Sequence, residues 1–162
     1  MGLHSIKIVF GKFSSIEELD VPDRALFKAA IRAMKSAYAP YSEFPVGAAI
    51  LLENGEIILG SNQENIAYPS GLCAERVALF AAATQFPDVP IVSLAITTQP
   101  QTEKSASEIT PCGACRQVML EYERRHSKDF KVITGAANGP ITVFNNAQSL
   151  LPLAFFDEAL GS

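Results

Sequence analysis

Helical and strand-like patterns of apolar residues divide the chain into segments. The first helical pattern begins near Pro22 and ends before Pro40. Its apolar positions recur three or four residues apart, at Leu26, Ala29, Ala30, Ala33 and Ala37. Two further helices are predicted at Ala74–Thr84 and Cys115–Arg125, with a short helix near the C-terminus.

Short apolar runs predict the strands. Val46–Leu52 is nearly all apolar, Asn54–Gly55 is a strong hairpin-turn signal, and Ile57–Leu59 follows as the partner strand. Three more strands are expected, at Ile91–Thr97, Phe130–Thr134 and Ile141–Phe144. This order of helices and strands predicts an α/β fold, a three-layer α/β/α sandwich on a mixed sheet of about five strands.

The composition fits one folded domain. The chain has 162 residues, of which 48% are hydrophobic and 19% charged, so it can bury a core and does not resemble a disordered protein. No repeat or Gly/Ser-rich linker divides it. We therefore expect an N-terminal extension over residues 1–21 and a single domain over residues 22–162.

Charge and the lengths of apolar runs argue against two classes of partner. The net charge of -4 argues against a nucleic-acid surface. The densest basic group, at residues 124–128, lies beside Glu121 and Glu123, as on a solvated helix end. The longest apolar run, Val46–Leu52, is too short to span a bilayer. We expect neither nucleic acid nor a membrane as partner.

Three cysteines are an odd number, which suits metal binding or catalysis in a reducing compartment better than a disulfide framework. The stretch around Lys7 and Lys12 has no signal-peptide hydrophobic region. Position 6 is Ile rather than the Ser or Thr of a myristoylation signal. A cytoplasmic location is the expectation.

The cysteines have the spacing of a zinc site. Pro111–Cys115 places Cys112 and Cys115 on one face of a helical turn, and Gly113 would let the backbone turn closely around the ion. Cys73, at the start of another predicted helix, can supply a third ligand, and helix N-termini stabilise thiolates. Redox motifs share the Cys-x-x-Cys spacing, and a single cysteine is most often a core residue. Three in this placement favour one zinc ion per chain.

No fourth protein ligand is evident, because His4 lies near the terminus and His126 at a charged helix end. Three ligands and one open position are typical of catalytic zinc, whose bound water becomes a nucleophile. Glu75 can move that water's proton only if Cys73 lies at the helix end; taken alone, it is a favourable charge in a first helical turn. Arg76 can donate to the sulfurs and offset their negative charge, with a surface arginine as the alternative.

Two motifs carry a family resemblance. Cys73–Arg76 reads Cys-Ala-Glu-Arg and Pro111–Gln117 reads Pro-Cys-Gly-Ala-Cys-Arg-Gln. Together they resemble the paired signature of the cytidine deaminases of the three-cysteine, homotetrameric type. The similarity extends in order and spacing over other segments, at Tyr38–Ala49, Asn62–Asn65, Tyr68–Pro69 and Leu150–Pro152. It covers the chain from Asp23 to Leu160.

The resemblance implies a reaction. It implies zinc-dependent hydrolytic deamination of cytidine and deoxycytidine to uridine and deoxyuridine, with release of ammonia, as in pyrimidine salvage. Cys73, Cys112 and Cys115 would hold one Zn²⁺ per subunit. Zinc-bound hydroxide would attack C4 of the base, and Glu75 would shuttle the protons.

The resemblance also implies substrate contacts. Phe44 would pack against the pyrimidine, and the Ala74 backbone would contact the base. Asn62 and Glu64 would hydrogen-bond the ribose hydroxyl. From the residues alone, Asn62 and Glu64 fit an ordinary strand-end turn and Phe44 a core position. The sequence departs from the family pattern between Asn62 and Glu64, where Gln63 replaces the usual Val or Ile.

The apolar segment Leu150–Phe156 is too hydrophobic for a free tail. One interpretation is a last helix packed on its own subunit. The resemblance implies the other, a homotetramer in which Tyr68 and Phe155 reach a neighbouring subunit's nucleoside pocket. Phe156–Asp157 replaces the family's small residue and proline, which leaves the path of the tail open.

Two other functions stay open. A related deaminase could act on another aminopyrimidine, such as a nucleoside antibiotic or a nucleotide, although Glu64 beside the sugar disfavours a phosphate. A non-catalytic zinc module for protein or nucleic-acid binding is the more distant alternative. The open ligand position and the acidic charge count against it. Release of ammonia from cytidine distinguishes the two.

Overall fold

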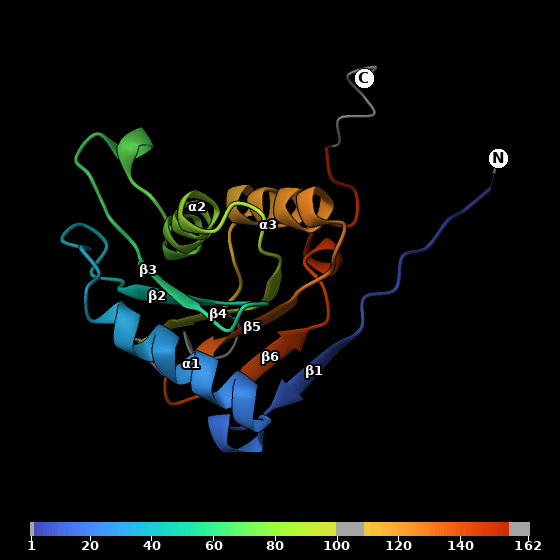
Figure 1. The fold of residues 1–162 in the computed structure, drawn as a ribbon, viewed down its shortest axis with the longest axis horizontal. Coiled ribbons are helices and arrows are strands. Elements are labelled where there is room, and N and C mark those ends of the chain that lie inside the picture. Colours follow the sequence, from blue (N-terminus) through green and yellow to red (C-terminus); the bar gives the residue numbers. More distant parts are fainter. Residues whose placement is uncertain (1, 100–108, 156–162) are drawn as a thin grey trace.

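A mixed six-stranded sheet forms the centre of the protein (Figure 1). The computed structural model describes residues 2–99 and 109–155. The strands are β1 Phe10–Phe13, β2 Val46–Leu52, β3 Ile57–Ser61, β4 Ile91–Thr98, β5 Lys131–Ala136 and β6 Ile141–Phe144. Their order across the sheet is β1-β6-β5-β4-β2-β3. Only β4 and β5 pair in parallel; the other neighbours are antiparallel.

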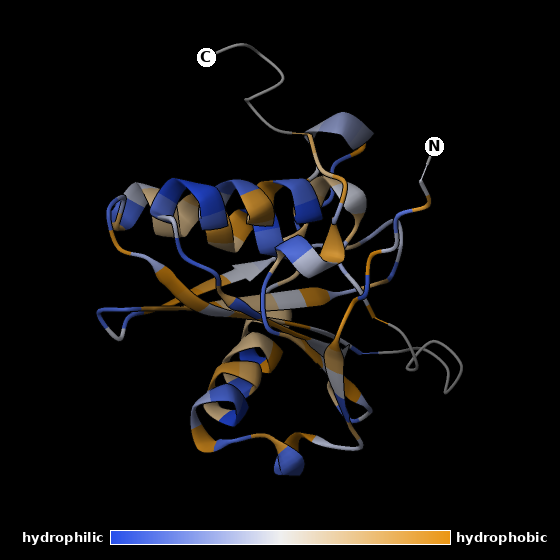
Figure 2. Cartoon of the chain, turned by 90° about the vertical axis from the view of Figure 1, so that its right-hand side faces the viewer, coloured by the Kyte–Doolittle hydropathy of each residue, from blue (hydrophilic) through white to orange (hydrophobic). Residues whose placement is uncertain are grey.

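Helices cover both faces of the sheet. Helix α1 (Val21–Met34) lies on one face, and α2 (Ala74–Gln85) and α3 (Gly113–His126) lie side by side on the other (Figures 1 and 2). This arrangement confirms the predicted three-layer α/β/α sandwich. No helix in the described ranges is both long and apolar enough to cross a bilayer.

The alternation of side chains along β2 builds two cores. Ala48, Ile50 and Leu52 face the layer of α2 and α3, whereas Ala49 packs with α1. Successive residues of a strand point to opposite faces, so a strand buried on both faces is apolar at nearly every position. This explains why Val46–Leu52 reads as a near-continuous apolar run.

The prediction of about five strands was one too few. The additional strand, β1, lies within the predicted N-terminal extension and pairs antiparallel with β6 at the edge of the sheet. Its residues alternate between exposed and half-buried, so the segment has no continuous apolar run to mark it. The division of the chain at residue 21 stays a prediction.

The first and the last predicted helices differ most from the structure. Helix α1 stops at Met34, so Ala37 lies beyond it. The amides of residues 35–37 donate to carbonyls three residues earlier, and Tyr38 N donates to Asn62 O at 2.9 Å. The chain therefore leaves the helix to pair beside the end of β3. Near the C-terminus a single 3₁₀ turn covers Gln148–Leu150, and residues 151–155 are not helical.

Gly60 in β3 allows α2 to lie directly on the sheet. A Cβ atom at this position would be 2.4 Å from Ala74 O and 2.6 Å from Ala78 N. Backbone atoms of a buried helix cannot move aside at low cost, so a larger residue would displace the start of α2. That start holds Cys73 and Glu75.

Candidate functional site

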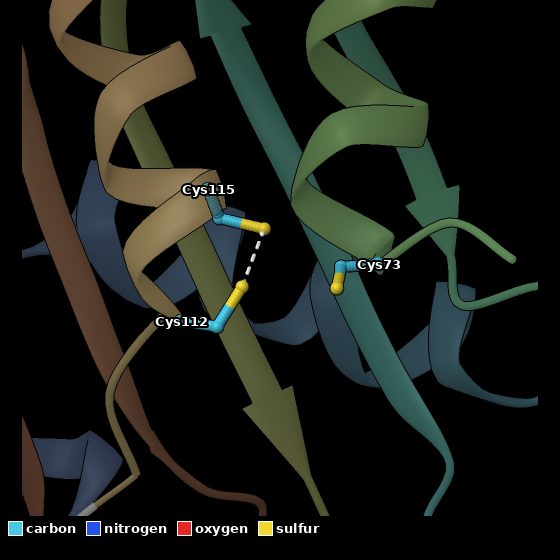
Figure 3. A group of neighbouring side chains, drawn as sticks. All are labelled: Cys73, Cys112 and Cys115. Atoms are coloured by element: carbon cyan, nitrogen blue, oxygen red, sulfur yellow. Dashed lines mark hydrogen bonds between the residues drawn. The ribbon is translucent and has the colours of Figure 1, made fainter. Parts of the chain in front are cut away.

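The three cysteines lie at helix N-termini on one side of the sheet. Cys73 is the N-cap residue of α2, Cys112 is the N-cap residue of α3, and Cys115 lies in the first turn of α3. Figure 3 shows their side chains between the starts of the two helices. Free backbone amides and the positive end of each helix dipole favour the thiolate form of the sulfurs.

The sulfur geometry fits a metal ion. The three Sγ atoms lie within 4.8 Å of one another, and Cys112 Sγ lies 3.4 Å from Cys115 Sγ. A tetrahedral zinc site with bonds of about 2.3 Å places its sulfurs about 3.8 Å apart. In residues 2–99 and 109–155 this is the one group of three or more His, Cys, Asp or Glu side chains close enough to bind one metal ion. Neither His4 nor His126 belongs to it.

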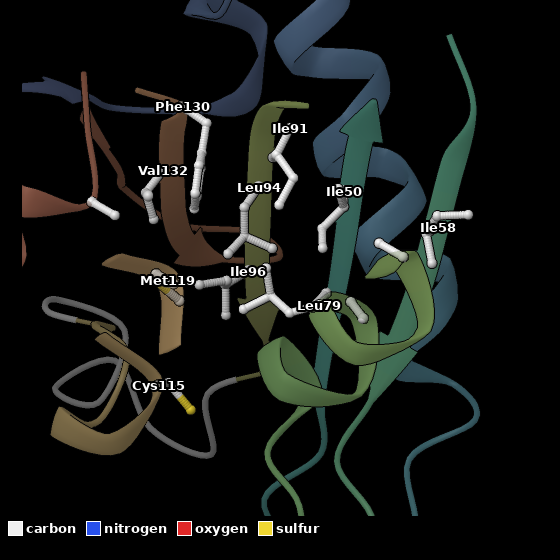
Figure 4. Packing of buried hydrophobic residues seen from close by; sticks show 14 of the residues in the cluster. Ile50, Ile58, Leu79, Ile91, Leu94, Ile96, Cys115, Met119, Phe130 and Val132 are labelled. Carbon is white, nitrogen blue, oxygen red and sulfur yellow. The ribbon is translucent and has the colours of Figure 1, made fainter. Parts of the chain in front are cut away.

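Burial differs among the three sulfurs. Cys115 is fully buried and belongs to the core cluster under α2 and α3, next to Met119 (Figure 4). Cys73 is half-buried and Cys112 is exposed. The group is therefore anchored in the core on one side and reachable from outside on the other, as a site with an open ligand position requires.

Gly113 is not needed for the turn between the ligands. Its φ is not in the left-handed region, and a Cβ atom there would meet nothing within 4 Å. The helix start itself aims Cys112 and Cys115 to one side, and the expectation that Gly113 lets the backbone turn closely around the ion stays a prediction.

Electrostatics favour a thiolate at Cys73. A hydrogen bond from the Cys115 thiol, followed by the nearby Arg76 guanidinium, lowers the pKa of Cys73 to about 5. The same pairing, together with burial, raises the pKa of Cys115. Arg76 Nη2 donates to Cys73 Sγ at 3.7 Å, so the guanidinium charge lies beside one sulfur of the group.

Glu75 is buried beside the cysteines. Its side chain is in the first turn of α2 and only 5% exposed. Burial raises the pKa of Glu75 to about 6, and the charge of Cys73 acts in the same direction, while a hydrogen bond from Cys115 opposes both. Cys73 lies at the helix end, so the condition for Glu75 to approach the metal group is met. A carboxyl group with a pKa near neutral can both accept and donate a proton.

A pocket of about 510 Å³ opens beside Cys73 and Arg76. Its remaining walls come from the loop after α1, the end of β3 and the connection to α2. They are Tyr41, Ser42, Asn62, Gln63, Glu64, Asn65, Tyr68, Gly71 and Leu72. The size and the mixed polar lining suit a small polar molecule.

Glu64 holds the loop that forms one wall of this pocket. Its Oε2 accepts from Tyr41 N at 2.9 Å and from Ser42 N at 3.3 Å, and its Oε1 accepts from the Ser42 hydroxyl. The Ser42 hydrogen bond, followed by that from Tyr41 N, lowers the pKa of Glu64. A carboxylate has room for further acceptor contacts, so Glu64 can also face a ligand.

Asn62 fixes the chain between Phe44 and β2. Its Oδ1 accepts from Val46 N at 2.8 Å and its Nδ2 donates to Phe44 O at 3.0 Å. Asn62 lines the pocket, whereas Phe44, 37% exposed, does not appear among its lining residues. Ala74 is fully buried at the start of α2.

Tyr68 and Phe155 expose their rings. Tyr68 is 75% exposed and packs edge-on against Tyr41, with ring centroids 6.2 Å apart. Phe155 is 63% exposed, and its carbonyl accepts from Gln117 Nε2 at 3.0 Å. The structure thus places Tyr68 at the pocket rim, while Phe155 lies outside the set of residues that line the pocket.

Tyr41, Ser42 and Leu72 are pocket residues that the sequence did not single out. Tyr41 and Ser42 fall inside the Tyr38–Ala49 segment, which resembles the family as a whole and gave neither residue a role of its own. The acidic partner of Ser42 lies 22 residues away. Nothing in the local pattern marks that pairing.

Comparisons with known proteins agree on one family. The family profile described as "Cytidine and deoxycytidylate deaminase zinc-binding region" matches residues 21–128. A cytidine deaminase of Halalkalibacterium halodurans is 43% identical over 135 residues, which cover 82% of this chain and 93% of that protein.

Solved structures show the same similarity. The crystal structure of cytidine deaminase from Burkholderia pseudomallei has a TM-score of 0.70 and 39% identity, and the match covers 81% of this chain and 97% of that one. That of cytidine deaminase from Mycobacterium tuberculosis has a TM-score of 0.63 and 34% identity, over 85% of this chain and 99% of that one.

Proposed function

Because this chain belongs to the cytidine and deoxycytidylate deaminase family, we propose that it hydrolyses the exocyclic amine of cytidine and deoxycytidine, releasing ammonia and leaving uridine and deoxyuridine. The reaction would return pyrimidine nucleosides to salvage. The observation that carries the proposal is the cysteine group with buried Glu75 beside it, of which Cys73 also lines a pocket of about 510 Å³.

Cys73, Cys112 and Cys115 would hold one Zn²⁺ per chain, which supplies an acidified water for the hydrolysis when bound. Arg76 supports this ligand set by donating to Cys73 Sγ. This hydrogen bond would make the sulfur donate less charge to the metal. The zinc ion would therefore stay a Lewis acid although three thiolates bind it.

Glu75 would move the protons. It is positioned beside the metal group by the first turn of α2, and burial tunes its pKa to about 6. It would take one proton from the attacking water and deliver it to the ring nitrogen, and then take the remaining proton of the added hydroxyl and deliver it to the departing amine. Both deliveries use the same carboxyl group, so no second acid is required.

The pocket would place the base toward the cysteines and the sugar toward Glu64. Glu64 and Asn62 both line the pocket, and both also hydrogen-bond to the loop that carries Phe44. Phe44 and the Ala74 backbone would contact the base. The low pKa of Glu64 keeps a negative charge near the sugar. That charge disfavours a 5′-phosphate, so nucleosides are proposed over nucleotides.

A homotetramer would complete the pocket. A single chain leaves the rings of Tyr68 and Phe155 largely exposed, and large exposed aromatic rings are typical of interaction surfaces. In a symmetric assembly the Phe155 ring, and the Tyr68 ring from the rim of its own pocket, would reach a neighbouring subunit's pocket and exclude water from it.

The test is turnover of cytidine by the purified protein. Ammonia and uridine should form in equal amounts, activity should fall when a chelator removes the metal, and added Zn²⁺ should restore it. Cytidine monophosphate should react poorly. A protein that binds one zinc ion per chain but forms no uridine would instead be a non-catalytic zinc module.

A further inference from the structure

The apolar segment Leu150–Phe155, called here the C-terminal segment, is tied to the helix that bears two of the cysteines. Two consecutive residues, Arg116 and Gln117, directly follow Cys115 in the first turns of α3. Both are half-buried, and both donate to carbonyl groups of the C-terminal segment.

Arg116 makes the first of two hydrogen-bond connections, called here ties, between α3 and the C-terminal segment. Its Nη1 donates to Leu150 O at 2.9 Å, where the C-terminal segment begins. Its Nε donates to Pro111 O at 2.8 Å and its Nη2 to Thr110 Oγ1 at 3.2 Å. All three guanidinium nitrogens are therefore used, in the fixed planar geometry that lysine cannot reproduce. One side chain connects the chain entering Cys112 with the start of the C-terminal segment.

Gln117 makes the second tie. Its Nε2 donates to Phe155 O at 3.0 Å, five residues further along the segment. The backbone of Phe155 is thus held on its own α3, while its ring stays 63% exposed. A ring presented outward from a fixed backbone is pre-organised for contact, so less conformational entropy is lost when it packs against a ligand or another chain.

We propose that Arg116 and Gln117 are positioning residues that set Phe155 relative to the metal-bearing turn of α3. This inference rests on the proposed function, in which Phe155 closes a nucleoside pocket. It assigns to the two residues after Cys115 a role in substrate affinity, distinct from the metal-binding role of the cysteines themselves.

Gln117→Leu tests the second tie, because it keeps the side-chain volume and removes the donor. We expect the zinc content to be unchanged, kcat to stay within about threefold and the KM for cytidine to rise about tenfold, the effect of one lost hydrogen bond. Gln85→Leu is the matched control. Gln85 donates to Ala81 O at the far end of α2, so its replacement should leave KM unchanged.

Arg116→Lys tests the first tie. It keeps the charge but cannot serve three acceptors, so we expect KM to rise as for Gln117→Leu and zinc to be lost at a lower chelator concentration. Arg125→Lys is its control, because Arg125 donates to Pro87 O at the other end of α3. Equal effects of the two arginine variants would overturn the assignment to Arg116.

A double-mutant cycle with Phe155→Ala separates positioning from general structure. If Gln117 acts through Phe155, adding Gln117→Leu to Phe155→Ala should raise KM less than about twofold further. Multiplicative effects, or a kcat loss without a KM change, would overturn the proposal.

Hydrogen exchange keeps the two proposals distinguishable. Gln117→Leu should speed exchange in residues 150–155 whether or not the wild-type protein deaminates cytidine. If the wild type shows no turnover and exchange still responds, the proposed function fails while the tie itself stands. Unchanged exchange in this variant contradicts the tie.

Discussion

At the scale of single residues, the site depends on where two carboxyl groups lie. Glu75 is buried beside the sulfurs and has its pKa raised to about 6, whereas Glu64 is hydrogen-bonded at the pocket wall and has its pKa lowered. Identical side chains are thus directed to different tasks by burial and hydrogen bonding. The first suits proton transfer, and the second suits a fixed acceptor.

Glu75→Gln should separate chemistry from folding. Glutamine keeps the size and some hydrogen bonding but cannot accept the water's proton. We expect kcat to fall at least about 10²–10⁴-fold while zinc content and thermal stability stay near wild type. Steady-state kinetics, metal analysis and a melting curve measure the three quantities. Near-normal turnover would assign the proton transfers to another group.

Cys112→Ala should remove the metal. Bound zinc should drop sharply from near one equivalent per chain, and the yield of soluble protein should fall, because bound metal contributes to folding. Gly113→Ala is the control, since a Cβ atom at the neighbouring position meets nothing within 4 Å. It should keep its zinc. Retention of the metal in Cys112→Ala would take Cys112 out of the site.

At the scale of elements, helix starts supply the site and strand ends supply the pocket. Cys73 and Cys112 are N-cap residues, and Gly60 brings the start of α2 down onto β3. The position of both helix starts therefore decides the sulfur separations. Interactions that hold α3 in place should affect the whole site.

Glu123 holds α3 in place in this way. This buried carboxyl group of α3 accepts from Phe130 N at 3.1 Å, Ala147 N at 2.6 Å and Gln148 N at 3.0 Å. It joins the helix to the chain before β5 and after β6. Burial raises the pKa of Glu123, a cost that these three amide donors partly offset.

Glu123→Ala should lower the free energy of unfolding by about 3 kcal/mol, because buried amides lose their acceptor. Denaturant titration measures the change. Glu121→Ala, at an exposed position on the same helix, should alter it by no more than about 0.5 kcal/mol. Equal stability of the two variants would show that water replaces the Glu123 carboxylate at no cost.

The sequence was sufficient where a pattern is local. Val46–Leu52 and Ile141–Phe144 match β2 and β6 residue for residue, because an apolar run bounded by turn residues defines a buried strand. The edge strand β1 was missed, since a half-exposed strand needs no such run. The cysteines were found by spacing. The hydrogen bond between Ser42 and Glu64 was not predicted, because it joins two segments that only the fold brings together.

At the scale of the whole molecule, the two aromatic rings that are proposed to act between subunits are exposed in the single chain. The backbone of Phe155 is fixed to α3, yet its ring is exposed, and the Tyr68 ring stands at the pocket rim with 75% of its surface exposed. The pocket of about 510 Å³ is open to solvent among the residues that the structure describes, whereas a closed active site keeps bulk water out. The proposed closure by another copy of the chain would keep that water out.

Mixing two inactive variants tests closure in trans. Glu75→Gln lacks the proton carrier, and Phe155→Asp lacks the closing ring; each should be inactive or nearly so alone. After dissociation and random reassembly of equal amounts, a site with both native residues needs one chain of each kind. About a quarter of the sites should then be intact in a symmetric tetramer, and about that fraction of wild-type activity should return. Mixing Glu75→Gln with Cys112→Ala is the control, because both residues serve the same chain's metal group and no mixture can rebuild it. Recovery in the first mixture alone assigns Phe155 to a neighbouring pocket. A verified mixed tetramer without recovery would assign the ring to its own subunit, and a monomer by light scattering would exclude closure by another copy.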